Sequence, residues 1–213
     1  MFEALFLFNI LKSNLVLLFR GYIQLKINKR MKTKRISDSL EKALNDQVTL
    51  EAYSAQMYLM LASWADENQW DGVNSFMMKH SYEERVHMAK IIEYIQERGG
   101  TVTIEAIPQP GPKPLNILEC FEAVLKQEVE NTEAIYNIVN MSLEEKDWAT
   151  WNFMQWLVAE QREEEKLALS LLDKVKLAGG YQMTDAAKFE VNKLIGNTSQ
   201  EFPIADHVNP LQE

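Results

Sequence analysis

Hydrophobic residues recur at steps of three and four positions along four long stretches of the chain. This spacing places them on one face of an α-helix, so it predicts four long amphipathic helices. A shorter stretch with the same spacing, about 184–195, predicts a fifth helix. The long stretches cover about 37–67, 71–98, 116–144 and 147–178.

Residues that favour helix ends lie at the borders of these stretches. Short polar side chains that cap helix N-termini precede each one, and glycine pairs follow the second and the fourth. Glu119 lies three residues after the third cap, as in a capping box. The expected caps are Ser37 or Ser39, Asp71, Asn116 and Asp147, and the expected stops are Gly99-Gly100 and Gly179-Gly180.

The connections between the helices predict the topology. The first and second helices, and the third and fourth, are joined by few residues and should be antiparallel neighbours. Seventeen residues lie between Arg98 and Asn116, with prolines at 108, 110, 112 and 114 that exclude a helix. This segment reaches at most about 56 Å, and the second helix is about 42 Å long. We therefore expect an all-α four-helix bundle with one long crossover and a short fifth helix.

Each of the four expected core stripes contains a glutamate near its middle. These are Glu51, Glu84, Glu128 and Glu164, and His87 lies three positions after Glu84, on the same helix face. Four carboxylates at one depth in a bundle repel one another unless cations bind between them or protons neutralise them. Oxygen ligands with one imidazole suit iron or manganese. The pattern therefore predicts a centre for a pair of divalent cations.

Simpler interpretations exist for several of these residues. A glutamate in a core stripe is also typical of a helix edge, and the charge run at 160–165 is typical of a solvated face. We read Glu165 as solvated and His80 as a core or interface histidine. Glu163 is either a ligand that faces a cavity or a wet residue on an inner surface.

Composition and charge restrict the function further. The formal net charge of −9 disfavours a nucleic-acid-binding surface and is compatible with cation handling. The single cysteine, Cys120, excludes an intramolecular disulfide and a thiolate cluster, so a reducing compartment is expected. We expect a cytoplasmic protein without a nucleic-acid or membrane partner.

The first thirty residues differ from the rest of the chain. They are apolar but interrupted by Glu3, Lys12 and Asn14, which disfavours both a signal peptide and a membrane span. We expect residues 1–30 to be a non-native or disordered extension and the functional chain to start at Met31. The alternative is a membrane or export anchor. Residues 31–198 would form the helical domain with the two-cation centre, and residues 199–213 a polar tail.

Four segments together resemble the helical signatures of the bacterial non-haem ferritins, within the ferritin-like di-iron family. They are LEAYSAQMYL, SYEERVHM, LKQEVEN and WNFMQWLVAEQREEEK, and the resemblance covers about 36–176. It implies a first iron site of Glu51, Glu84 and His87, with Glu84 bridging to a second iron. Tyr58 matches the tyrosine beside the first site, a transient electron donor.

The resemblance also implies the remaining ligands. The second iron site would add Glu128, Gln161 and Glu164. A third site would use Glu83, Glu160 and Glu163 and share Glu164. The fourth helix has Gln161-x-x-Glu164 where haem-containing relatives have a second Glu-x-x-His, so no haem is expected.

The function implied by the resemblance is a ferroxidase and iron store. Two Fe²⁺ ions would be oxidised to Fe³⁺ by O₂ or H₂O₂, and the product stored as ferric oxide inside a cage of 24 copies. One alternative is a passive cage subunit with a degenerate centre, which the ligand set Glu51, Glu84, His87 and Glu128 disfavours. Another is a DNA-protecting miniferritin, which the acidic charge, the ligands inside the bundle and the expected fifth helix disfavour.

Overall fold

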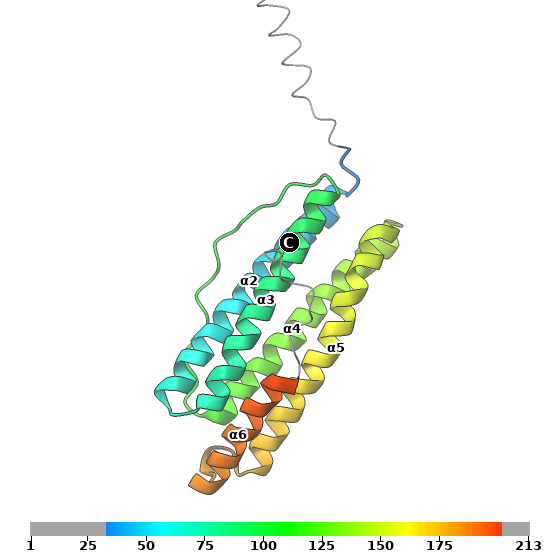
Figure 1. Ribbon diagram of the computed structural model, residues 1–213. Helices are drawn as coiled ribbons and strands as arrows, with labels where there is room; N and C mark the ends of the chain where they lie inside the picture. Colours follow the sequence, from blue (N-terminus) through cyan, green and yellow to red (C-terminus); the bar gives the residue numbers. More distant parts are fainter. Residues whose placement is uncertain (1–32, 202–213) are drawn as a thin grey trace, which may run out of the picture. The chain divides into compact units, whose positions relative to one another are not determined.

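The computed structural model describes residues 33–201, and these form the expected single-crossover bundle (Figure 1). The expected extension at 1–30, and the proposed start at Met31, lie outside the described residues. No strand occurs between residues 33 and 201. The elements are α2 (Asp38–Glu67), α3 (Asp71–Glu97), α4 (Ile117–Glu144), α5 (Trp148–Leu177), the 3₁₀ turn η1 (Gly180–Gln182) and α6 (Asp185–Glu201).

Three of the expected helix caps are confirmed. Ser37 accepts a hydrogen bond from the Leu40 amide, Asn116 from the Glu119 amide and Asp147 from the Thr150 amide. Such caps satisfy amide groups that have no partner within the helix. The expected glycine stops are also confirmed, since Gly99 and Gly179 both have positive φ.

The prediction of Asp71 as the cap of α3 is wrong. Asp71 lies in the first turn of the helix, and the preceding residue, Trp70, makes no capping hydrogen bond. Asn192 of α6 supplies the cap instead, because its Oδ1 accepts from the amides of Gly72 at 2.8 Å and Val73 at 3.3 Å. A cap from a distant helix leaves no local sequence signal.

The proline-rich segment runs along α2 as an extended strap (Figure 1). Near the start of α2, Asn45 accepts from the Thr103 amide at 2.7 Å and donates to the Thr101 carbonyl at 3.0 Å. Near the end of α2, Lys113 Nζ lies 2.5 Å from Glu67 Oε1. The strap therefore returns the chain to the end of the bundle where α3 began, so α3 and α4 run in the same direction.

The helix α6 packs at the end of the bundle where α2 joins α3 (Figure 1). Two glycines allow this approach, since a Cβ on Gly72 would meet the Asn192 carbonyl oxygen at 2.0 Å and one on Gly196 would meet the Gly72 Cα at 3.0 Å. The helix continues to Glu201, past the expected end at 195 and into the expected tail. The sequence has no proline between the start of α6 and Glu201, since the first one after this start is Pro203, so no proline ends the helix sooner.

Buried hydrophobic residues form two clusters, one toward each end of the bundle. One contains Leu61, Phe76 and Phe121, and the other contains Leu44 and Ile91. Polar residues of α2, α3, α4 and α5 are buried between these clusters along the same helices. Within residues 33–201, no helix is both long and apolar enough to cross a membrane.

Candidate metal centre

Glu51, Glu84 and His87 meet in the buried middle of the bundle. Glu51 comes from α2 and the other two from successive turns of α3. His87 Nδ1 lies 3.4 Å from Glu84 Oε2 and 3.8 Å from Glu51 Oε2. The exposed fractions are 0% for Glu51, 5% for Glu84 and 7% for His87. One ligand atom from each residue can therefore reach a single ion.

The atoms that face one another in this triad make no hydrogen bonds. Glu51 Oε2, Glu84 Oε2 and His87 Nδ1 are all buried without a hydrogen-bond partner. Unsatisfied buried polar atoms are costly, and most proteins avoid them. A divalent cation coordinated by all three would satisfy them, so the donor set fits a metal ion of the iron class.

The electrostatics of the triad favour neutralisation. Burial, followed by the charge of Glu84, raises the pKa of Glu51 well above its usual range. Burial, followed by the charge of Glu128, does the same for Glu84. Burial and mutual repulsion therefore favour the protonated carboxyls, and a bound cation would displace the protons.

Two amide side chains hold Glu51 in place. Gln47 Nε2 donates to Glu51 Oε1 at 2.8 Å and to Asn131 Oδ1 at 2.5 Å. Asn131 lies on α4 and is fully buried. Sequence reasoning did not single out this support. Asn131 is a polar residue one turn after Glu128 on the same helix face, and this position was a sequence signal. Its pairing with Gln47 depends on the packing of α4 against α2.

Glu128 lies in a different environment, because its oxygens already have hydrogen-bond partners. The Tyr58 hydroxyl donates to Oε1, and Gln161 Nε2 lies 3.2 Å from Oε2. Burial, together with the charge of Glu164, raises the pKa of Glu128 to about 7. Burial and the neighbouring Glu128 also raise the pKa of Tyr58 well above its usual range.

Glu164 does not join Glu128 in one group of possible ligands. It meets His80 and Glu83 instead, with His80 Nε2 at 3.4 Å from Glu164 Oε2 and 3.9 Å from Glu83 Oε2. Burial disfavours a charged Glu164, but the hydrogen bond and charge of His80 outweigh it and hold the pKa below its usual value. His80 is buried, as expected, and it also faces two carboxylates.

Of the other expected residues of the third site, Glu160 and Glu163 lie further out, whereas Glu83 does not. Glu160 is half-buried, and burial raises its pKa. The Glu163 side chain is 63% exposed and lies 3.7 Å from Arg162. Glu83 is only 18% exposed, and burial raises its pKa as well. Glu165 is half-buried, so it is less exposed than its reading as solvated implied.

Trp156 of α5 forms part of the wall beside His87. The two rings meet edge to face with centroids 5.4 Å apart, and Lys90 Nζ lies 4.4 Å from the Trp156 ring. No pattern in the sequence singled out Trp156. Its contact with a candidate ligand depends on how α5 packs against α3.

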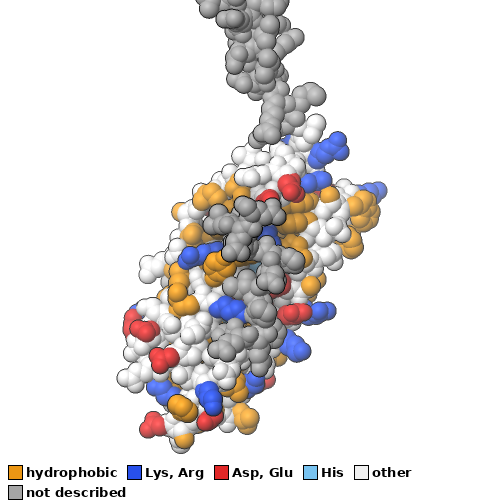
Figure 2. Space-filling view, viewed as in Figure 1, with side chains coloured by type: hydrophobic (Ala, Val, Ile, Leu, Met, Phe, Trp, Pro, Cys, Tyr) orange, Lys and Arg blue, Asp and Glu red, His pale blue; other side chains and the backbone are white. Residues whose placement is uncertain are grey.

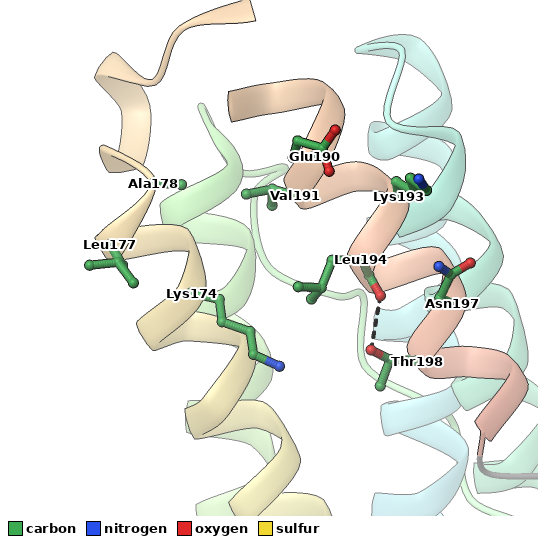
Figure 3. A pocket seen from close by; sticks show the side chains of 9 residues that line it. All are labelled: Lys174, Leu177, Ala178, Glu190, Val191, Lys193, Leu194, Asn197 and Thr198. Atoms are coloured by element: carbon green, nitrogen blue, oxygen red, sulfur yellow. Dashed lines mark hydrogen bonds between the residues drawn. The ribbon is translucent and has the colours of Figure 1, made fainter. Parts of the chain in front are cut away.

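A surface groove of about 610 Å³ lies away from these residues (Figure 3). It runs between the end of α5, with Lys174 and Leu177, and α6, with Glu190, Lys193 and Leu194. None of the expected ligands lines it. The groove is therefore separate from the candidate centre.

Comparisons with known proteins agree with this arrangement. The family model of the ferritin-like domain matches residues 41–178. The chain is 37% identical over 164 residues to a probable bacterial non-haem ferritin-like protein of Haemophilus influenzae, covering 77% of this chain and 98% of that protein. It is 38% identical over 144 residues to a bacterial non-haem ferritin of Campylobacter jejuni, covering 68% and 86%.

A solved structure supports the same assignment. The open pore ferritin of the archaeon Archaeoglobus fulgidus superposes with a TM-score of 0.73 at 38% identity, covering 76% of this chain and 98% of that one. Family match, sequence identity and fold coincide over the helices that carry the carboxylates. The chain therefore belongs to the ferritin family, with bacterial non-haem ferritins among its relatives.

Proposed function

We propose that this protein is a ferroxidase that stores iron. Two Fe²⁺ ions are its substrates, and they bind in the buried centre and are oxidised to Fe³⁺. Membership of the ferritin family supports the iron-storage role. The observation that carries the ferroxidase role is the triad of buried, unpaired ligand atoms on Glu51, Glu84 and His87.

In this proposal the first ion is held by Glu51, Glu84 and His87. Glu84 bridges to a second ion, which Glu128, Gln161 and Glu164 complete. The influence of the Glu128 charge on the pKa of Glu84 supports this bridge, because it indicates that the two carboxyls are close. A cation between them would relieve that repulsion.

The electrons and protons balance with either oxidant. Each Fe²⁺ loses one electron, and O₂ takes both electrons and two protons to form H₂O₂. With H₂O₂ as the oxidant, the same electrons and two protons give two water molecules. Carboxylate ligands stabilise the higher charge of Fe³⁺ more than that of Fe²⁺, which favours oxidation. Tyr58, which donates to Glu128, is the proposed transient electron donor.

Storage requires copies of the chain to associate. Large apolar side chains are exposed, among them Leu115 at 86%, Trp148 at 62% and Phe189 at 65%. Such side chains favour association, and Figure 2 shows hydrophobic side chains among charged ones on one face of the molecule. We propose a cage of 24 copies in the cytoplasm, with a third site that includes Glu83, Glu160, Glu163 and Glu164 on the route to the mineral.

Aerobic oxidation of Fe²⁺ tests the proposal. Purified full-length protein is mixed anaerobically with two Fe²⁺ per chain, air is admitted, and the ferric absorbance is followed. We expect Glu84→Ala to slow the initial rate by more than about 100-fold, since even residues that only orient metal ligands contribute about 10–100-fold. The exposed Glu133→Ala, the matched control, should oxidise at the wild-type rate. Equal, slow traces for all three proteins would favour the passive cage subunit.

A further inference from the structure

Four rings of α3 and α5 follow one another from the candidate centre toward the end of α3. His87 and Trp156 meet edge to face with centroids 5.4 Å apart, and Trp156 meets Phe153 in the same way at 6.1 Å. Phe153 then stacks on Tyr94, with centroids 3.9 Å apart and the two planes at 5°. The rings therefore form a continuous chain from a proposed iron ligand to Tyr94.

The hydrogen bonds of Tyr94 fix the direction in which its phenol proton points. The Tyr94 hydroxyl oxygen lies 2.8 Å from Thr150 Oγ1. Thr150 Oγ1 lies 2.9 Å from Asp147 Oδ2, and a carboxylate oxygen only accepts. The one hydroxyl hydrogen of Thr150 is therefore donated to Asp147, so Tyr94 donates its own hydrogen to Thr150. These three side chains form a path for a proton that leads away from the centre.

The surroundings of Tyr94 couple the loss of an electron to the loss of this proton. Tyr94 is 7% exposed, and Thr150 is fully buried. Burial raises the pKa of Tyr94 above its ordinary value, so the ring is a neutral phenol before it is oxidised. An oxidised phenol is a strong acid. Its proton can move to Thr150 while the hydroxyl proton of Thr150 moves to Asp147.

The separation between Tyr94 and the centre suits electron transfer. Tyr94 follows His87 by seven residues, which corresponds to about 10 Å along the axis of α3. Electrons cross distances of this size in proteins, and aromatic rings in contact favour the transfer. An electron from Tyr94 can therefore reach the centre without any movement of the helices.

We propose that Tyr94 is a second electron donor to the centre, used when a chain holds one Fe²⁺ instead of two. Reduction of O₂ to H₂O₂ takes two electrons, and a single Fe²⁺ supplies only one of them. Tyr94 supplies the other through the rings of Phe153 and Trp156. The inference rests on the proposed function, because it requires O₂ to react in the buried centre.

Electrons, protons and charge balance in this step. One Fe²⁺ becomes Fe³⁺, and the phenol of Tyr94 becomes a neutral tyrosyl radical when it loses one electron and one proton. O₂ takes both electrons and two protons from solvent to form H₂O₂. The phenol proton moves by way of Thr150 to Asp147, which becomes neutral.

Tyr58 and Tyr94 have different surroundings, so variants can separate the two proposed donors. Tyr58 donates its hydrogen bond to Glu128, which is itself a proposed iron ligand. The proton of Tyr94 leads instead to Asp147, which is paired with Arg98 at 3.0 Å and is not a proposed ligand. A radical that forms in the absence of Tyr58 therefore reports on Tyr94.

Freeze-quench electron paramagnetic resonance tests the proposal. Full-length Tyr58→Phe protein, made with or without ring-deuterated tyrosine, is loaded anaerobically with one Fe²⁺ per chain, mixed with O₂ and frozen at successive times. We expect a tyrosyl signal that ring deuteration narrows and that is lost in Tyr58→Phe/Tyr94→Phe. The matched control Tyr58→Phe/Tyr136→Phe should keep it, because Tyr136 is 51% exposed and is not one of the four rings. No signal in Tyr58→Phe, or an equal signal without Tyr94, overturns the inference.

The proton path has a test of its own. After the transfer, Thr150 holds the former phenol proton and donates it to the radical oxygen, which lowers the largest g value of the radical in high-field spectra of Tyr58→Phe. Thr150→Val in the same background keeps every ring and the backbone amide that Asp147 caps. We expect this variant, with folding checked by circular dichroism, to form less radical. A largest g value typical of a radical without a hydrogen bond overturns the path through Thr150.

The outcomes separate this inference from the proposed function. Wild-type protein that rapidly oxidises two Fe²⁺ per chain, combined with no Tyr94-dependent signal at one Fe²⁺ per chain, overturns this inference alone. Failure of the ferroxidase role has a different signature, because the wild type would then oxidise Fe²⁺ no faster than Glu84→Ala.

Discussion

The two halves of the buried centre differ in how their ligand atoms are satisfied. In the Glu51 half, the inward oxygens of Glu51 and Glu84 and the nitrogen of His87 have no hydrogen-bond partner. In the Glu128 half, both carboxylate oxygens of Glu128 accept hydrogen bonds, Oε1 from Tyr58 and Oε2 from Gln161. Glu164, the other proposed ligand of that half, faces His80.

This difference indicates an order of binding. The Glu51 half gains coordination without losing protein contacts, because its ligand atoms already lie together. The Glu128 half must exchange hydrogen bonds for metal bonds and move Glu164 toward the ion. We therefore expect the first half to bind a cation more tightly than the second, and four measurements test this comparison.

The pH dependence of stability should show the largest effect in the Glu128 half, where Glu128→Gln isolates one of the carboxyls whose pKa is raised. Glu128 has its pKa raised from 4.5 to about 7 in the folded protein. Its contribution to stability is fully present below pH 4.5 and is lost as the pH rises through 7, which corresponds to roughly 3 kcal/mol. Guanidinium unfolding of metal-free protein between pH 4.5 and 8 should show this loss, and Glu128→Gln should reduce it. Equal slopes in both proteins would contradict the shift.

Neutralising one ligand in each half tests the order of binding directly. Glu51→Gln should weaken the affinity of the tightest Zn²⁺ site by more than about 100-fold. The substitution removes a charged ligand, and residues that only orient a ligand already contribute about 10–100-fold to metal affinity. Glu128→Gln should weaken a looser site and leave the tightest one unchanged. Calorimetric titration reports both affinities, with Glu133→Gln as the exposed control. A reversed pattern would assign the tighter site to the Glu128 half.

Removal of the Tyr58 hydroxyl should loosen the Glu128 half. A hydrogen bond to a charged group contributes about 1.5–3 kcal/mol. Tyr58→Phe should therefore lower the free energy of unfolding of metal-free protein by about 2 kcal/mol at pH 8, where Glu128 is ionised. Tyr136→Phe, at a residue that is 51% exposed, is the control and should change little. Chemical denaturation at pH 8 measures both, and equal losses would contradict the role of the hydroxyl.

Loss of the support for Glu51 should have the smallest effect. Gln47→Met removes the amide that orients Glu51. We expect the affinity of the tightest Zn²⁺ site to fall by about 10-fold, the lower end of the range for such contacts. The exposed Gln56→Met on the same helix is the control. An unchanged affinity would show that Glu51 is held by helix packing alone.

Much of the fold was predictable because its signals are local. Helix spacing, Ser37, Asn116 and the prolines of the strap act through neighbouring residues, and the structure confirms the helices and the crossover they predicted. The Asn192 cap and the contact between Gly72 and Gly196 join segments about 120 residues apart. No local pattern identifies such partners.

The sequence by itself determined which residue types lie in the middle of each helix, since helical periodicity sets the inward face. It thereby placed Glu51, Glu84, His87 and Glu128 in the interior, and all four are buried. Only the tertiary structure decided which of them meet, because the rotation and depth of each helix depend on packing against the others. That packing paired Glu128 with Tyr58 and Glu164 with His80.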